Sequence, residues 1–226
     1  MSRLKEFNKY LPLGVDSPDD ISAIIMESWD DLFSMESDQV EAWRLNSARS
    51  RFNGLRDGVK ILGMCADERG IKQIDCYEDI IPLLFQHTQY KSYPLVLVEK
   101  GNFRLLTKWL DGLTTVDLSQ VDVSGCNSID SWLEQLEIQA DLYVTHTAGT
   151  TGKLSFFPRS VLEQALYTFG ALKLFEAFGE EAGENIGFDG VRLPAMYPSS
   201  RHGRYAANRL LDGYSKYVTP TPDQVY

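Results

Sequence analysis

A glycine- and threonine-rich segment between two short apolar runs constrains the fold of this chain more than any other feature. Residues 144–155, VTHTAGTTGKLS, contain four threonines, two glycines and one lysine. The apolar runs at its two ends, residues 142–144 and 154–157, are typical of short β-strands. Glycine adopts positive φ without strain and lets backbone N–H groups approach a ligand closely. The segment therefore predicts a loop between two strands, either an anion-binding loop or an ordinary turn.

The residue types in this loop leave both interpretations open. Several threonine hydroxyls and Lys153 exceed what a plain turn requires, although turns rich in glycine and threonine are common. The phosphate-binding loop of mononucleotide-binding NTPases has glycine, four residues and then Gly-Lys-Ser/Thr. Counting back from Gly152, the first of these positions is Thr147, and Leu154 follows the lysine. Two required positions fail, which excludes that motif.

The rest of the chain predicts an α/β fold in which helices come first. Helices are expected over residues 17–35, about 38–62, 105–113, from 128 onward, 160–179 and 205–217, and strands over residues 95–98, 142–144, 154–157 and 191–197. Gly54 and Gly58 are expected to weaken the second helix. We predict a helical N-terminal region, residues 1–69, and a partial α/β region, residues 70–226, in which helices flank a partial mixed sheet. The four tryptophans lie in the apolar stripes of these helices and are expected in the core.

Composition excludes several classes of function. The net charge of −10 repels nucleic-acid backbones, so no nucleic-acid partner is expected. No apolar run approaches the ~20 residues that cross a membrane, and the polar N-terminus does not resemble a secretory signal. We therefore expect the protein to be cytoplasmic and not to contact a membrane. The three cysteines and three histidines lack metal-ligand spacing, so no metal site of the chain's own is predicted.

The loop resembles that of a known enzyme family. Residues 147–153, TAGTTGK, are similar to the Thr/Ser-Ser-Gly-Thr-Thr-Gly loop of adenylate-forming enzymes, the acyl-CoA synthetase superfamily. Lysine directly after the last glycine resembles the branch of phenylacetate–CoA ligases and acyl-protein synthetases. Residues 77–84, YEDIIPLL, look like the Asp-Ile-Pro region that precedes the loop in that branch, and residues 201–203, RHG, are weakly similar to its His-containing acyl-pocket segment. The resemblance covers about residues 70–212.

The chain also departs from the family pattern. Ala148 stands where the family has Ser or Gly, Leu154 replaces a common Pro, and Ser155 replaces a terminal Lys or Arg. The sequence has no Tyr-Gly-x-Thr-Glu segment, no later Thr-Gly-Asp and no C-terminal catalytic lysine region. These absences predict that the chain is the N-terminal portion of such an enzyme.

The resemblance implies ATP-dependent activation of a carboxylic acid as acyl-AMP, followed by acyl transfer to a thiol, such as that of coenzyme A, or to another nucleophile. Residues 70–226 are then a nucleotide-binding region, and Mg²⁺ accompanies ATP. The expected pyrophosphate-binding residues are Thr147, Gly149, Thr150, Thr151, Gly152 and Lys153. His202 is the candidate catalytic residue beside the acyl pocket; its alternative is a solvated histidine at a helix start. His146 is expected to be a strand-end histidine bonded to the backbone. The alternative function is a non-catalytic binding or interaction module.

Overall fold

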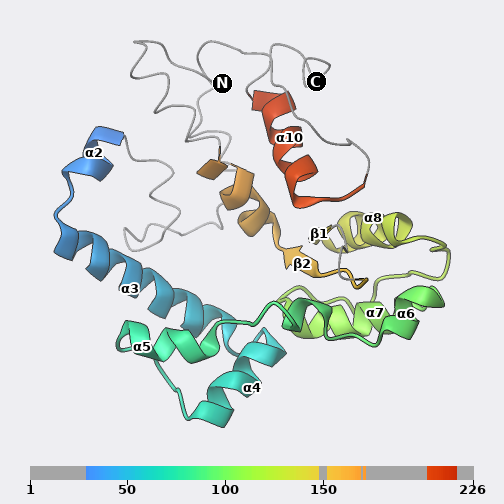
Figure 1. Ribbon diagram of the computed structural model, residues 1–226, viewed down its shortest axis with the longest axis horizontal. Coiled ribbons are helices and arrows are strands. Elements are labelled where there is room, and N and C mark those ends of the chain that lie inside the picture. Colours follow the sequence, from blue (N-terminus) through green and yellow to red (C-terminus); the bar gives the residue numbers. More distant parts are fainter. Residues whose placement is uncertain (1–28, 148–151, 169, 172–202, 218–226) are drawn as a thin grey trace. The chain divides into compact units, whose positions relative to one another are not determined.

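The computed structural model describes residues 29–147, 152–168, 170–171 and 203–217 (Figure 1). These residues fall into two compact units. One consists of residues 35–160, and the other of residues 29–34 together with the described part of 161–217. The predicted boundary between residues 69 and 70 lies inside the first unit. As predicted in outline, helices and strands are mixed, but the described residues are mostly helical with a small antiparallel sheet.

The first unit contains most of the described elements. Its helices and strands are α3 (Ser37–Leu55), α4 (Lys60–Arg69), α5 (Tyr77–Ile80), α6 (Leu95–Glu99), α7 (Phe103–Leu110), α8 (Ile129–Ala140), β1 (Tyr143–His146) and β2 (Phe156–Arg159). Short 3-10 turns, η2 (Ile81–Leu83), η3 (Gln89–Lys91) and η4 (Asp111–Leu113), connect some of them.

The weakening predicted at Gly54 and Gly58 corresponds to a break at Gly58, whereas Gly54 lies within the continuous helix α3. Helix α3 ends at Leu55 and α4 begins at Lys60. Gly58 lies in the gap, where a Cβ atom would stand 2.9 Å from Cγ2 of Thr115. No larger residue fits there without movement of its neighbour. The break lets α3 and α4 enclose a small core made by Phe52, Ala66, Ile74 and Leu83.

The strand predicted over residues 95–98 is wrong, because these residues form helix α6. Pro94 is the N-cap of the helix and has the extended backbone angles expected at that position (φ −61°, ψ 125°). Leu95 and Val96 are exposed, whereas Leu97 and Val98 pack against the main core. Burial in adjacent pairs suits a helical turn and not the alternation of a strand. Tertiary packing here outweighs the β-propensity of valine.

The main core lies where α7 and α8 pack against the hairpin. Trp132 of α8 is fully buried, stacks on Phe103 with ring centroids 5.9 Å apart, and meets the edge of Phe156 at 5.2 Å. Its indole Nε1 donates a hydrogen bond of 2.9 Å to Oγ1 of Thr107. Ser128 caps α8 as predicted, and accepts a 3.1 Å hydrogen bond from the Ser131 N–H.

The two predicted strands around the loop exist, each displaced by one or two residues. They pair antiparallel with Val144 opposite Pro158 and His146 opposite Phe156. The Thr147 N–H donates to the Ser155 carbonyl at 3.1 Å. Because bonded and non-bonded pairs alternate along an antiparallel ladder, Val144 and Pro158 form a non-bonded pair. Proline therefore fits inside β2, because its missing N–H is not needed by β1.

In the second unit, residues 161–168 are helical and α10 spans Ala206–Tyr217. A Cβ atom on Gly213 would lie 2.5 Å from Cγ2 of Thr168, so glycine permits close packing there. Helix α2 (Trp29–Ser34) is the described part of the helix predicted over residues 17–35. The strand predicted over residues 191–197 lies outside the described residues. Among the described helices, none combines the length and the apolar character needed to cross a membrane.

Candidate functional site

The base of the glycine-threonine loop is closed by hydrogen bonds between its two ends. The Thr147 N–H donates to the Ser155 carbonyl, and the Ser155 N–H donates to the Thr147 Oγ1, both at 3.1 Å. The backbone N–H of Thr147 is therefore used within the hairpin. Its hydroxyl proton has no acceptor in the part of the chain that the structure describes, and the residue is exposed. Gly149, Thr150 and Thr151 lie outside the described residues.

Gly152 has the backbone conformation that its residue type predicts. Its φ is +82°, in the left-handed region, and a Cβ atom placed on it would meet no atom within 4 Å. The space beside its backbone is therefore open. A positive φ is strained for other residues, so glycine is required by conformation at this position.

Lys153 turns toward Tyr93. Its Nζ donates a hydrogen bond to the Tyr93 carbonyl and lies 4.5 Å from the centroid of the Tyr93 ring. Burial lowers the pKa of the Lys153 ammonium, and the positive charge of Lys91 lowers it further. An ammonium has three N–H donors, so one bond to Tyr93 leaves two for a ligand.

Tyr93 and Lys91 belong to this site, although neither residue lies in a sequence motif. The Tyr93 hydroxyl donates a 2.8 Å hydrogen bond to the Leu154 carbonyl, so Tyr93 holds two consecutive residues at the end of the loop. The Tyr93 side chain is buried, and its ring meets those of Trp109 and Phe156 at 5.0 and 5.5 Å. Burial raises the pKa of Tyr93 to about 12. No sequence pattern links residues 93 and 153, which are sixty positions apart.

The remaining predicted residues have simpler positions. Nδ1 of His146 lies 2.9 Å from the Thr147 carbonyl, so Nδ1 carries a proton and the predicted backbone bond is confirmed. His202 lies outside the described residues.

In the segment over residues 77–84, the Asp79 carboxylate accepts hydrogen bonds from the Asp75 and Cys76 N–H groups at 2.9 and 3.0 Å. These bonds lower the pKa of Asp79, with the bond from Asp75 the larger cause. Asp79 therefore fixes the start of α5.

Taken together, the described atoms form the two ends of the glycine-threonine loop. They provide open space beside Gly152, the hydroxyl of Thr147, whose oxygen accepts from the Ser155 N–H, and the cations Lys153 and Lys91. Within the described ranges, no group of three or more His, Cys, Asp or Glu side chains could hold a metal ion. No protein-family model, no curated protein and no solved structure matches this chain.

Proposed function

We propose that this chain takes part in ATP-dependent activation of a carboxylic acid, as the N-terminal portion of an adenylate-forming ligase. One observation carries the proposal. The loop between β1 and β2 ends in Gly152, which has a φ of +82° and open space beside its backbone, and Lys153 follows directly. The sequence resemblance over residues 147–153 supplies the reaction class. The partial mixed sheet with flanking helices and the cytoplasmic location belong to the same proposal.

The local charges support a polyphosphate ligand. The chain carries a net charge of −10, yet Lys91 and Lys153 are close enough for one to lower the pKa of the other. Two adjacent cations repel each other, and a bound polyanion relieves that repulsion. The described ammonium groups and open backbone are of the kind that bind the polyphosphate end of ATP, which supports the proposal. We assign Mg²⁺ no protein ligand, because the described residues contain no metal-binding group.

In the proposed reaction, a carboxylate oxygen of the substrate attacks the α-phosphorus of ATP and the bond to pyrophosphate breaks. Negative charge grows on the leaving pyrophosphate, and fixed N–H and ammonium donors stabilise it. Gly152 and Lys153 would supply such donors, with Thr147 and residues 149–151 completing the loop. The acyl group of acyl-AMP then passes to a thiol, such as that of coenzyme A, and AMP leaves. His202 is the proposed residue beside the acyl group.

Titration calorimetry with pyrophosphate and with Mg-ATP tests this function on the chain itself. We expect Lys153→Ala and Thr150→Val each to weaken binding by about tenfold or more, because each removes a donor to a charged ligand. Lys72→Ala is the matched control, because Lys72 is exposed and remote from the loop in sequence. We expect the chain alone to be incomplete and inactive, so carboxylate-dependent exchange of pyrophosphate into ATP is assayed in the full-length protein, where the same variants should abolish it.

Equal binding by the wild type, both loop variants and the control would contradict the proposal. Absence of any binding at millimolar nucleotide would favour the second candidate, a non-catalytic binding or interaction module. The bond from Lys153 to the Tyr93 carbonyl favours that candidate, because it shows a structural use for the lysine. In that case Lys153→Ala should lower the melting temperature and change nothing else.

A further inference from the structure

A cavity of about 580 Å³ lies along α7 and shares no residue with the glycine-threonine loop. One wall comes from α7 and the others from residues 111–123 that follow it. Cavities of about 300–1,000 Å³ are typical of small-molecule sites. The size therefore suits a small organic ligand.

The cavity has an apolar wall that the core holds in place. Leu118 and Val123 line it and are themselves buried members of the main core. Val121 packs against the same core, and Leu105 of α7 lines the cavity with 42% of its surface exposed. An apolar ligand group placed here would cover Leu105 without displacing any core side chain.

The charged residues at the cavity are mainly basic. Arg104 and Lys108 lie four positions apart on α7 and therefore on one side of the helix. Both side chains are exposed, and neither has an ion pair or hydrogen bond with the residues that the structure describes. In the sequence, this pair is visible as two cations at helical spacing beside a leucine. Nothing in the sequence predicts the cavity wall formed by residues 111–123.

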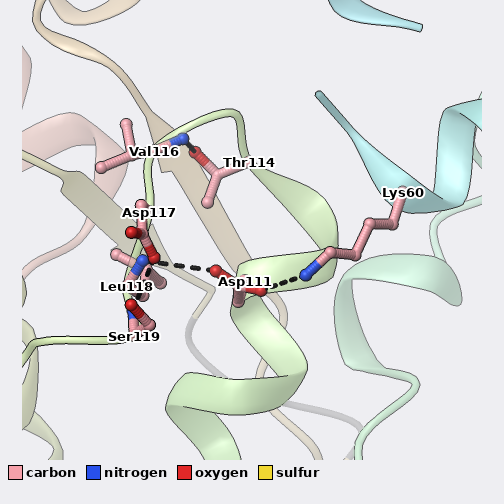
Figure 2. A network of polar contacts seen from close by, with 7 residues as sticks. All are labelled: Lys60, Asp111, Thr114, Val116, Asp117, Leu118 and Ser119. Atoms are coloured by element: carbon pink, nitrogen blue, oxygen red, sulfur yellow. Dashed lines mark hydrogen bonds and ion pairs between the residues drawn. The ribbon is translucent and has the colours of Figure 1, made fainter. Parts of the chain in front are cut away.

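The acidic residue of the cavity is already bonded. One carboxylate oxygen of Asp111 accepts from Nζ of Lys60, and the other accepts from the Leu118 N–H at 3.3 Å (Figure 2). The neighbouring Asp117 accepts a 2.9 Å bond from the Ser119 N–H and does not line the cavity. The two unpaired cations therefore face a cavity whose own carboxylate is neutralised by Lys60.

We infer that this cavity binds a small organic anion with an apolar body, of the class of medium-chain carboxylates. The carboxylate lies between Arg104 and Lys108, and the apolar body lies on Leu105 and Val121. This binding does not rest on the proposed ligase function, because the two sites have no residue in common.

Calorimetric titration of the full chain with octanoate at low salt tests the inference. We expect a dissociation constant of about 1 mM or below, a modest value for a ligand of this size. Octanamide has the same apolar body without the charge and should bind about tenfold more weakly. Butyrate should also bind more weakly, because each methylene that enters the cavity contributes about a three- to fourfold change. Added salt should weaken octanoate binding by screening the two cations.

Charge variants locate the site. Arg104→Gln and Lys108→Gln should each weaken octanoate binding about three- to tenfold, and the double variant more than either. Lys100→Gln is the matched control: it is exposed, directly follows α6, changes the net charge equally and does not line the cavity. All three positions are exposed, so thermal unfolding should show that the variants fold.

Three results would overturn the inference: no binding at about 10 mM octanoate, equal binding of octanoate and octanamide, or an unchanged affinity in the double variant. Lys153→Ala should retain octanoate binding. Failure of the nucleotide experiments and failure of this one are therefore distinguishable.

Discussion

At the scale of single residues, Tyr93 organises the end of the loop through three separate groups. Its carbonyl accepts from Lys153, its ring lies under the same ammonium, and its hydroxyl donates to the Leu154 carbonyl. A buried phenol resists ionisation, which is why its pKa rises to about 12. The end of the loop at Lys153 and Leu154 is therefore sensitive to one residue outside it.

This sensitivity gives a prediction for Tyr93→Phe. At neutral pH the variant should be less stable by about 1 kcal/mol, because the Leu154 carbonyl loses its hydrogen bond. Between pH 10 and about 12, the unfolded wild type releases a phenol proton that the folded state retains, so its free energy of unfolding falls as pH rises. Tyr93→Phe has no phenol to ionise, so its free energy of unfolding lacks this decrease. The stability advantage of the wild type over Tyr93→Phe should therefore shrink above pH 10.

Urea unfolding at about pH 8 and about pH 11 measures the effect. Tyr77→Phe is the control, because it removes a 3.0 Å bond to the Glu41 carbonyl at an exposed position and should cost less at neutral pH. A difference between wild type and Tyr93→Phe that stays constant across this range would contradict the prediction.

At the scale of elements, local signals in the sequence predicted one helix break and one helix start. Gly58 marked the break between α3 and α4, and Ser128 marked the start of α8. Ser128 acts on the backbone of Ser131, three residues away, whereas Gly58 also makes room for the distant Thr115. Helix α6 was not predictable in this way, because packing of Leu97 and Val98 against the core decides its conformation. The bond between Lys153 and Tyr93 was equally hidden, since it joins segments that local patterns treat separately.

Helix α8 should depend measurably on its cap. Ser128→Ala removes the acceptor for the Ser131 N–H and should destabilise the protein by about 1 kcal/mol. Ser50→Ala makes the same change at an exposed position inside α3, where alanine should be neutral or slightly stabilising. Thermal or urea unfolding of the two variants provides the comparison. Equal effects would show that the cap contributes nothing specific.

At the scale of the whole molecule, α4 connects the two hydrophobic cores of the first unit. Ala66 lies in the small core, while Ile61 packs against the main core. Lys60 of α4 and Asp111 of η4 form an ion pair. Asp111 also accepts a hydrogen bond from the Leu118 N–H (Figure 2). We therefore expect residues 35–160 to unfold as one cooperative unit.

The two members of this ion pair should differ in importance. Lys60→Ala breaks an exposed pair and should cost at most about 1 kcal/mol, an effect that high salt removes. Asp111→Ala should cost about 1–3 kcal/mol, because it also leaves the N–H of the buried Leu118 without an acceptor. Urea unfolding at low and high salt separates the two contributions. Equal costs for both variants would contradict this assignment.

The position of Pro158 has a consequence for self-association. At a non-bonded pair the main-chain groups point away from β1, so the side of β2 opposite β1, which pairs with no other described strand, offers a carbonyl but no N–H at this residue. A strand from another copy of the chain would find the hydrogen-bonding register interrupted there, which is how natural sheets discourage edge-to-edge aggregation. The same proline that leaves the hairpin intact thus makes its outer margin a poor template for further strands.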